Sequence, residues 1–354
     1  MKNWDAIVVG AGIIGLALAL ELNKRGLRVL VVEKGEPGRE ASWAAGGMLC
    51  DFPLETQPEL RELATASAGM YPEFVSELEN ESGLKIDLRA VGTLIFVSRK
   101  TGHGPGSALP RPLEELEPAL RAKDSAGFFV KERCVDPRHL TAAAIAAARH
   151  RGVEFSSGEE VLAVEVADGK VCGVRTSRTQ FAAGVVVNCA GAWAGQISPH
   201  SFPTRPVKGQ MLCVDMPEKE MVRHVVRTIG WPQDVYLIPR SDGRMTIGAT
   251  SEEAGFDKET VSETISKLRQ AAMDLVPRLA DARVLETWAG LRPGTPDKLP
   301  ILGATATPGY FVATGHFRDG ILLAPVTATV MGQVMAGEKP EFELKAFGAE
   351  RFPR

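Results

Sequence analysis

The 354-residue sequence has little cysteine and no long uninterrupted hydrophobic segment. Its five cysteines stand singly, without a C-x-x-C pair, so they predict neither a disulfide framework nor a metal site. They favour a reducing compartment, which we expect to be the cytoplasm. The longest apolar run, from Ala6 to Leu20, is shorter than the roughly 20 residues that a transmembrane helix needs. We expect no transmembrane segment, and Asp5 ahead of this run argues against a signal peptide.

The chain also lacks a strong excess of charge of either sign. It carries 41 basic and 44 acidic residues, a formal net charge of −3, which provides no general attraction for nucleic acid. We therefore expect no nucleic-acid partner. Apolar residues make up 44% of the chain and charged residues 24%, which excludes a disordered or fibrous protein. At roughly 150 residues per domain, the length predicts two or three domains, or one domain interrupted by another.

Glycine is abundant, and three glycines form the first motif. A β-branched run ends at Val9 and leads directly into the G-x-G-x-x-G spacing of residues 10–15. An apolar helical stretch and a second strand ending at Glu33 follow, so the segment predicts a βαβ unit that binds a dinucleotide. Gly10 permits the tight turn, Gly12 lets the backbone approach the pyrophosphate, and Gly15 lets the helix pack closely. Glu33 can accept hydrogen bonds from a ribose, but the motif leaves the identity of the dinucleotide open.

The later segments predict an antiparallel sheet inserted into this α/β framework. Residues 161–181 alternate apolar and polar residues around Asp168 and Gly169, which indicates a hairpin. The pattern is strongly β from residue 206 to 250. A glycine-rich turn at 313–321 then leads into an apolar helix at 326–335, whose N-terminus could face a second part of the cofactor. This order predicts two interleaved domains rather than two consecutive ones.

Five segments resemble the flavoprotein amino acid oxidases, a family that includes glycine oxidase, D-amino acid oxidase and monomeric sarcosine oxidase. The glycine oxidases of thiamine biosynthesis are nearest. The segments are VVGAGIIG at 8–15 with Glu33, AAGGML at 44–49, PVKGQ at 206–210, WAGLRPGTPD at 288–297 and GHFRDGILLAP at 315–325. The resemblance implies an α/β FAD-binding Rossmann-like domain of the glutathione-reductase type, interleaved with an antiparallel-sheet (α+β) substrate domain. We expect the FAD-binding domain over residues 1–85, 134–203 and 288–354, and the substrate-binding domain over 86–133 and 204–287.

The resemblance further implies which residues contact FAD. It places Ile13 and Ile14 at the pyrophosphate, Glu33 and Lys34 at the adenosine, 46–48 beside the flavin and 316–322 at the isoalloxazine. The full implied set is Gly10, Gly12, Ile13, Ile14, Gly15, Glu33, Lys34, Ser42, Ala45, Gly46, Gly47, Met48, Val161, Gly191, Trp193, His316, Phe317, Arg318, Asp319, Gly320, Ile321 and Leu322. Family members with covalent flavin use a cysteine in the C-terminal motif, whereas the last cysteine here is Cys213. We therefore expect noncovalent FAD.

Oxidation of an amino acid by flavin requires a cation for the substrate carboxylate more than it requires an acid or a base. By resemblance, the catalytic residues are Arg292 as the carboxylate clamp, Tyr236 on the substrate sheet and Arg318 in support. The residues alone leave alternatives open: Arg292 could form an interdomain salt bridge, Tyr236 could be a core tyrosine and Arg318 could pair with Asp319. We interpret His316 as a structural residue of the flavin loop. Core or surface roles suffice for Lys208 and Trp231.

The implied function is FAD-dependent oxidative deamination of glycine, sarcosine or a small D-amino acid. The products are an imine, which hydrolyses to a 2-oxo acid with release of ammonia or amine, and hydrogen peroxide from oxygen. The glycine imine could supply thiazole synthesis for thiamine. Ser251 stands where the glycine oxidase used for comparison carries Met, and the loop at 231–234 also differs, so we expect the pocket to accept a side chain larger than hydrogen.

Four other functions fit parts of the sequence. They are a D-amino acid dehydrogenase that passes electrons to a quinone or another acceptor, a nicotinamide-dependent dehydrogenase, an FAD module acting on modified tRNA, and a flavin-binding protein without catalysis. The C-terminal flavin motif argues against the nicotinamide enzyme, and the net charge gives the tRNA function little support. The oligomeric state is left open, with a homo-oligomer among the options.

Overall fold

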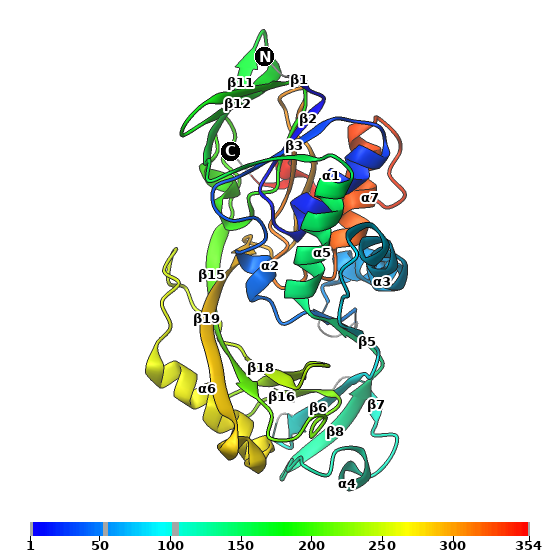
Figure 1. The fold of residues 1–354 in the computed structure, drawn as a ribbon, viewed down its shortest axis with the longest axis vertical. Coiled ribbons are helices and arrows are strands. Elements are labelled where there is room, and N and C mark those ends of the chain that lie inside the picture. Colours follow the sequence, from blue (N-terminus) through cyan, green and yellow to red (C-terminus); the bar gives the residue numbers. More distant parts are fainter. Residues whose placement is uncertain (1–2, 52–55, 101–105, 353–354) are drawn as a thin grey trace.

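The computed structural model describes residues 3–51, 56–100 and 106–352. In the view of Figure 1, one large sheet, which contains β2 and β3, lies above the other, and the long strands β15 (Arg205–Asp215) and β19 (Arg283–Gly294) of the lower sheet extend up toward it. No helix formed by these described residues has the length and apolar character required to cross a membrane.

The first large sheet has six strands in the order β10 (Glu154–Ser157), β3 (Val29–Glu33), β2 (Ala6–Val9), β14 (Val186–Asn188), β21 (Tyr310–Thr314) and β20 (Ile301–Ala304). All neighbouring strands are parallel except β20, which runs antiparallel to β21. The predicted βαβ unit is confirmed: β2, helix α1 (Ile13–Lys24) and β3 follow one another, and β2 pairs with β3.

Alternating residues of β2 and β3 face two different layers, as the two-residue period of a strand requires. Ala6, Val8, Val29 and Val31 pack with helices α1, α3 (Arg61–Ser82), α5 (Pro137–His150) and α7 (Ala324–Met335). Ile7, Val9, Leu30 and Val32 pack toward a four-stranded sheet in the order β1 (Asn3–Trp4), β13 (Gln180–Ala183), β12 (Lys170–Thr176) and β11 (Val161–Ala167). The central sheet is therefore covered on both faces.

Local signals placed two of these elements correctly. The hairpin β11–β12 turns at Asp168 and Gly169, whose φ values of +49° and +76° match the type I′ turn that favours this pair. Helix α5 begins after Asp136, whose carboxylate accepts a hydrogen bond from the Arg138 amide at 2.9 Å. Helices α3 and α6 (Ser262–Leu275) were not predicted.

The second large sheet has eight strands in the order β19, β15, β18 (Arg244–Gly248), β17 (Tyr236–Pro239), β16 (Val225–Ile229), β6 (Thr93–Ser98), β8 (Ser125–Val130) and β7 (Ser107–Ala108). The predicted antiparallel pairing of residues 206–250 is confirmed, with one parallel pair between β16 and β6. Leu268, Ala272 and Leu275 of α6 share a core with Leu212 and Val214 of β15.

Short elements complete the described chain. A small sheet contains β4 (Met48–Leu49), β9 (Arg133–Val135) and β5 (Leu88–Arg89), and single-turn α-helices are α2 (Ala41–Ala44) and α4 (Leu113–Leu116). The 3-10 helices are η1 (Pro58–Leu60), η2 (Gly191–Gln196), η3 (Pro277–Asp281), η4 (Lys345–Phe347) and η5 (Ala349–Arg351). We keep the two-domain division as a proposal, in which β19 crosses the boundary at residue 288.

Candidate active site

A cavity of about 1230 Å³ is lined by residues from both large sheets. Of the contacts that the resemblance implies, all except Gly15 and Leu322 lie in its wall, and so do Arg292 and Tyr236. The fold therefore brings together residues that are more than 300 positions apart in the sequence. Its wall includes the start of α1 and residues of the strands β15, β17 and β19.

Close packing at the start of α1 requires glycine at two positions. Gly10 has a φ of +101°, and a Cβ there would lie 2.6 Å from the carbonyl oxygen of Cys189. A side chain at Gly15 would collide with the Gly10 carbonyl, so Gly15 serves the helix–strand packing that the motif predicts and lies outside the cavity wall. The first turn of α1 has no acidic side chain, and the Ile13 amide donates to the Ser42 hydroxyl at 2.9 Å. Such a helix N-terminus favours an anionic ligand.

Glu33, at the end of β3, anchors the glycine-rich turn. Its carboxylate accepts hydrogen bonds from the Ala11 amide at 2.8 Å and the Gly35 amide at 3.0 Å. The side chain is buried yet borders the cavity. A carboxylate has about four acceptor positions, so two backbone contacts leave it able to accept hydrogen bonds from a ribose as well.

Lys34 and Trp193 meet at the same end of the cavity. The Lys34 Nζ lies 3.0 Å from the Trp193 ring centroid, a cation–π contact, and burial lowers the pKa of the Lys34 ammonium. Phe256 packs against Trp193, and the two ring centroids are 5.1 Å apart. Phe256 was missed by the sequence analysis because its segment has no recognisable motif.

Arg292 on β19 extends across the neighbouring strand β15. The backbone of Arg292 pairs with Val207, and its Nη1 donates to the Thr250 carbonyl at 3.1 Å and to the Lys208 carbonyl at 3.4 Å. Within the part of the chain that the structure describes, it forms no ion pair with a carboxylate. Burial lowers the pKa of the Arg292 guanidinium, but arginine stays charged in proteins. A charged, carbonyl-supported guanidinium therefore borders the cavity.

Tyr236 on β17 lies beside this guanidinium. Its hydroxyl contacts the Met211 Sδ at 3.5 Å, which is a weak acceptor. Burial raises the pKa of Tyr236, and the nearby charge of Arg292 offsets part of that rise, so the phenol is protonated at neutral pH. A Cβ at Gly248, which pairs with Tyr236, would lie 2.8 Å from the hydroxyl oxygen. The phenol thus occupies space that only a glycine leaves open.

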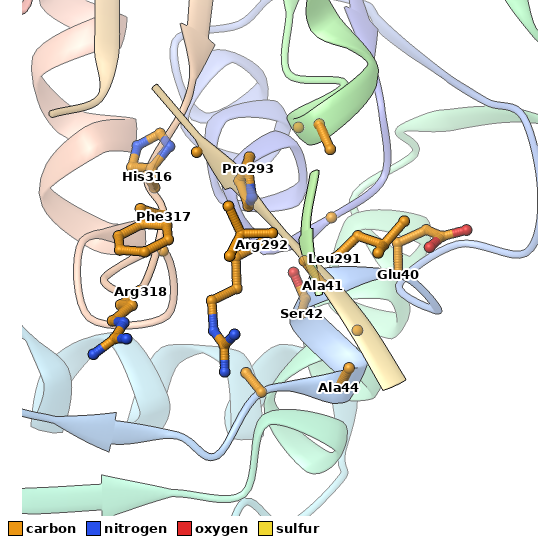
Figure 2. Close-up of a pocket in the computed structure, with 18 of the residues that line it drawn as sticks. Glu40, Ala41, Ser42, Ala44, Leu291, Arg292, Pro293, His316, Phe317 and Arg318 are labelled. Atoms are coloured by element: carbon orange, nitrogen blue, oxygen red, sulfur yellow. The ribbon is translucent and has the colours of Figure 1, made fainter. Parts of the chain in front are cut away.

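The turn that follows β21 carries three further predicted residues. Figure 2 shows Arg318 and Arg292 both extending toward the bottom of the view, with Phe317 and His316 above Arg318. Arg318 is exposed, its guanidinium carbon lies 5.4 Å from the Phe317 ring centroid, and no ion pair joins it to Asp319 or to any other described residue. His316 is 3% exposed, and burial lowers its pKa to about 3. Its Nε2 hydrogen-bonds the Thr327 hydroxyl at 3.1 Å, a structural contact.

Helix α3 holds this turn in place. The Tyr71 hydroxyl donates to the Ile321 carbonyl, and the Ser67 hydroxyl donates to the Leu322 carbonyl at 2.6 Å. Leu322 is 2% exposed and belongs to the core, which explains why its side chain is absent from the cavity wall. Of the two residues given only weak roles, Lys208 is buried in an ion pair and Trp231 packs at the edge of a core.

Comparison with known proteins places this arrangement in a family. The model of the DAO family, described as FAD dependent oxidoreductase, matches residues 5–334. The chain belongs to this family. The expected cofactor class and enzyme class are therefore confirmed: this is an FAD-dependent oxidoreductase.

Three relatives show how far the similarity extends. Glycine oxidase from Pseudomonas aeruginosa is 35% identical, over 94% of this chain and 95% of the relative. The bifunctional protein ThiO/ThiG from Trichormus variabilis is 34% identical over 99% of this chain, which spans only 55% of that relative. The crystal structure of glycine oxidase from Geobacillus kaustophilus superposes with a TM-score of 0.92 at 30% identity, covering all of both chains. The predicted fold class is thereby confirmed.

The described residues fit the family's cofactor. A helix N-terminus without an acidic side chain and the absence of a side chain at Gly12 in the cavity wall suit a pyrophosphate, and the Glu33 carboxylate suits a ribose. The same cavity is lined by the turn at residues 316–321 and by Arg292.

Proposed function

We propose that this FAD-dependent oxidoreductase oxidises a small amino acid, with glycine, sarcosine and small D-amino acids as candidate substrates. The observation that carries the proposal is Arg292, a charged guanidinium that borders the cavity without a carboxylate partner in the described chain. A planar guanidinium can hold a carboxylate through two parallel hydrogen bonds. Glycine oxidases among the relatives support the same substrate class.

FAD held noncovalently by the wall that includes Gly12, Glu33 and residues 316–321 would supply the two-electron chemistry, as acceptor of the α-carbon hydride, with oxygen as the final acceptor and hydrogen peroxide as the reduced product. The amino acid becomes an imine, and water then converts this imine to a 2-oxo acid and ammonia or amine. The protein's part is to bind, orient and exclude water. Arg292 fixes the carboxylate, the protonated Tyr236 hydroxyl donates a further hydrogen bond to it, and Arg318 adds positive charge at the entrance.

Neutral His316 takes no part in proton transfer in this proposal. Its low pKa and its bond to Thr327 leave it uncharged at the pH where amino acids are oxidised. The substrate amine therefore has to lose its proton to solvent before oxidation. The ThiO/ThiG relatives favour a role of the glycine imine in thiazole synthesis for thiamine, which we include as the physiological proposal.

The proposal is tested by steady-state assays of the purified holoenzyme with glycine, sarcosine, D-alanine and D-proline, measuring oxygen uptake and peroxide together. Arg292→Ala should raise KM by roughly two orders of magnitude, because a charge-assisted bidentate contact is lost. Arg283→Ala is the matched control, since Arg283 lies on the same strand, is exposed and pairs only loosely with Asp215 at 3.7 Å. Oxidation without peroxide would favour a dehydrogenase with another acceptor, and an unchanged KM would remove Arg292 from the site.

A further inference from the structure

Gln210, in the PVKGQ segment, is fully buried and lies outside the cavity wall, yet both ends of its amide hold the segment of residues 249–261. Its Nε2 donates to both carboxylate oxygens of Glu252, at 2.9 and 3.2 Å. Its Oε1 accepts a hydrogen bond from the Val261 amide at 2.6 Å. One side chain therefore fixes the segment at two points nine residues apart.

Thr250 links this network to the guanidinium of Arg292. The Thr250 hydroxyl accepts a hydrogen bond from the main-chain N–H of Gln210 at 2.9 Å and donates one to the Glu252 carboxylate, which the Gln210 side chain also holds. The Thr250 carbonyl is the nearer of the two oxygens that receive the Arg292 Nη1, at 3.1 Å. The position of that carbonyl is thus set by Gln210 and Glu252 together.

Lys208 anchors the same segment from the neighbouring position on β15. Its side chain is 2% exposed, and its Nζ pairs with Asp257 at 2.6 Å. Its backbone exchanges two hydrogen bonds with Glu252, both 2.9 Å long, and its carbonyl is the second acceptor for Arg292. Both acceptors of the guanidinium are therefore tied to Glu252.

We propose that Gln210 is a positioning residue that aims Arg292 at the substrate carboxylate, acting through Glu252 and Thr250. This inference rests on the proposed function of Arg292. Two parallel hydrogen bonds to a carboxylate require a fixed orientation of the guanidinium plane. The hydrogen bonds that the guanidinium makes to protein acceptors, and the residues that hold those acceptors, fix this orientation. Without the Gln210 amide, the Val261 amide loses its acceptor and the Glu252 carboxylate loses a donor, so the segment shifts to find replacements.

A structural role and a positioning role of Gln210 predict different effects on the measured constants. If Gln210 only stabilised the fold, its loss would weaken FAD binding and substrate binding alike. If it aims Arg292, its loss weakens carboxylate recognition specifically, and a reciprocal exchange of Gln210 and Glu252 should restore it. The exchange Q210E/E252Q keeps an amide and a carboxylate facing each other, and the carboxylate can still accept from the Val261 amide.

The experiment uses the holoenzymes of the wild type, Gln210→Met, Q210E, Q210E/E252Q and Arg292→Ala. Gln270→Met is the matched control, because Gln270 also donates to a carboxylate, that of Asp274 at 2.9 Å, but on the exposed face of α6. Four quantities are measured: KM and kcat for the best amino acid, the dissociation constant of acetate from the flavin absorbance, and that of FAD.

We expect Gln210→Met to raise KM and the acetate dissociation constant by about tenfold, with kcat and FAD affinity changed by less than about threefold. The exchange Q210E/E252Q should return KM to within about threefold of the wild type, whereas Q210E alone should not. If Gln210→Met gives no folded holoenzyme, Q210E and the exchange provide the same comparison.

Two results would overturn the inference while leaving the proposed function intact. One is an increase of KM and acetate dissociation constant in Arg292→Ala but not in Gln210→Met. The other is an equal loss of FAD affinity and substrate affinity in Gln210→Met or Q210E that the exchange does not repair. If Arg292→Ala itself leaves both constants unchanged, the proposed function fails, and the role of Gln210 fails with it.

Discussion

The guanidinium of Arg292 lies directly against the α-carbon of Gly209, which belongs to the neighbouring strand β15. A Cβ built on Gly209 would be 2.5 Å from both terminal nitrogens of Arg292 and 2.7 Å from its central carbon. The absence of a side chain at this one position lets the arginine cross the strand and reach the Thr250 carbonyl. The conformation of the Arg292 side chain therefore depends on the glycine at position 209.

Gly209→Ala tests this dependence. Gly209 does not have a positive φ, so the added methyl group acts on Arg292 rather than on the backbone. Because the displaced atoms are the end of a flexible side chain, we expect a folded protein whose KM for the amino acid is about tenfold higher. Gly184→Ala, where a Cβ meets nothing within 4 Å, should leave KM unchanged. Equal KM values in both variants would show that the guanidinium does not need this space.

Tyr236→Phe removes a hydroxyl that contacts the Met211 sulfur at 3.5 Å and hydrogen-bonds the Arg292 guanidinium. Since a hydrogen bond to a charged group contributes roughly 1.5–3 kcal/mol, we expect KM to rise by about tenfold or more with little loss of thermal stability. Tyr310→Phe is the contrasting control, because the Tyr310 hydroxyl accepts from the Asn188 amide in the core at 3.1 Å. Tyr310→Phe should lower Tm and leave KM unchanged. An unchanged KM in Tyr236→Phe, or a raised KM in Tyr310→Phe, would contradict the placement of Tyr236 in the substrate site.

Trp193→Leu removes the ring that carries the Lys34 ammonium at the cofactor end. We expect FAD affinity to fall by about tenfold, since a partly desolvated cation–π contact and an aromatic surface are lost together. At saturating FAD, KM for the amino acid should not change. Trp4→Leu, which removes a ring that packs against Phe181 and is not part of the cavity wall, should leave FAD affinity as it is. Titration of the apoprotein with FAD distinguishes the two variants.

His316 makes stability depend on pH in a defined direction. Burial lowers its pKa to about 3, whereas an unfolded histidine titrates near 6.5. Below about pH 6.5 the unfolded chain binds a proton here that the folded protein does not, so this residue lowers stability as the pH falls, by about 1.4 kcal/mol per unit. Tm should drop more between pH 7.5 and 5.5 in the wild type than in His316→Asn. The exposed His150→Asn control should behave like the wild type, and identical drops in all three would disprove the effect.

Elements with local signals were predictable from the sequence, and elements held by distant contacts were not. The glycine spacing at 10–15, the Asp168–Gly169 turn and the Asp136 cap each act over a few residues, and each forms as expected. Helix α3 was missed because Pro72 lies inside it, which argues against a helix, and because its buried residues are spread over 22 positions of mixed polarity. Tertiary packing on α5 and α7 stabilises it instead.

The candidate site divides in the same way. Arg292, Tyr236 and the turn at 316–321 lie in motifs whose resemblance to known oxidases locates them, and the fold brings them to one cavity. Gln210 and Gly209 lie in the PVKGQ motif too, but their contacts depend on which residues of β19 and of the segment after β18 lie opposite them. That register is set by the pairing of strands 40 to 80 residues apart, which no local pattern reveals.

The central claim is that Arg292 holds an amino acid for oxidation by FAD, and anaerobic mixing tests it most directly. Wild-type holoenzyme and Arg292→Ala are mixed without oxygen with glycine, sarcosine, D-alanine and D-proline, and the flavin absorbance is followed near roughly 450 nm. The account predicts rapid bleaching of the wild type by at least one substrate, recovery with peroxide when oxygen is admitted, and far slower bleaching of Arg292→Ala at low substrate concentration. Wild-type flavin that none of the four amino acids bleaches, or equal rates in both proteins, would contradict it.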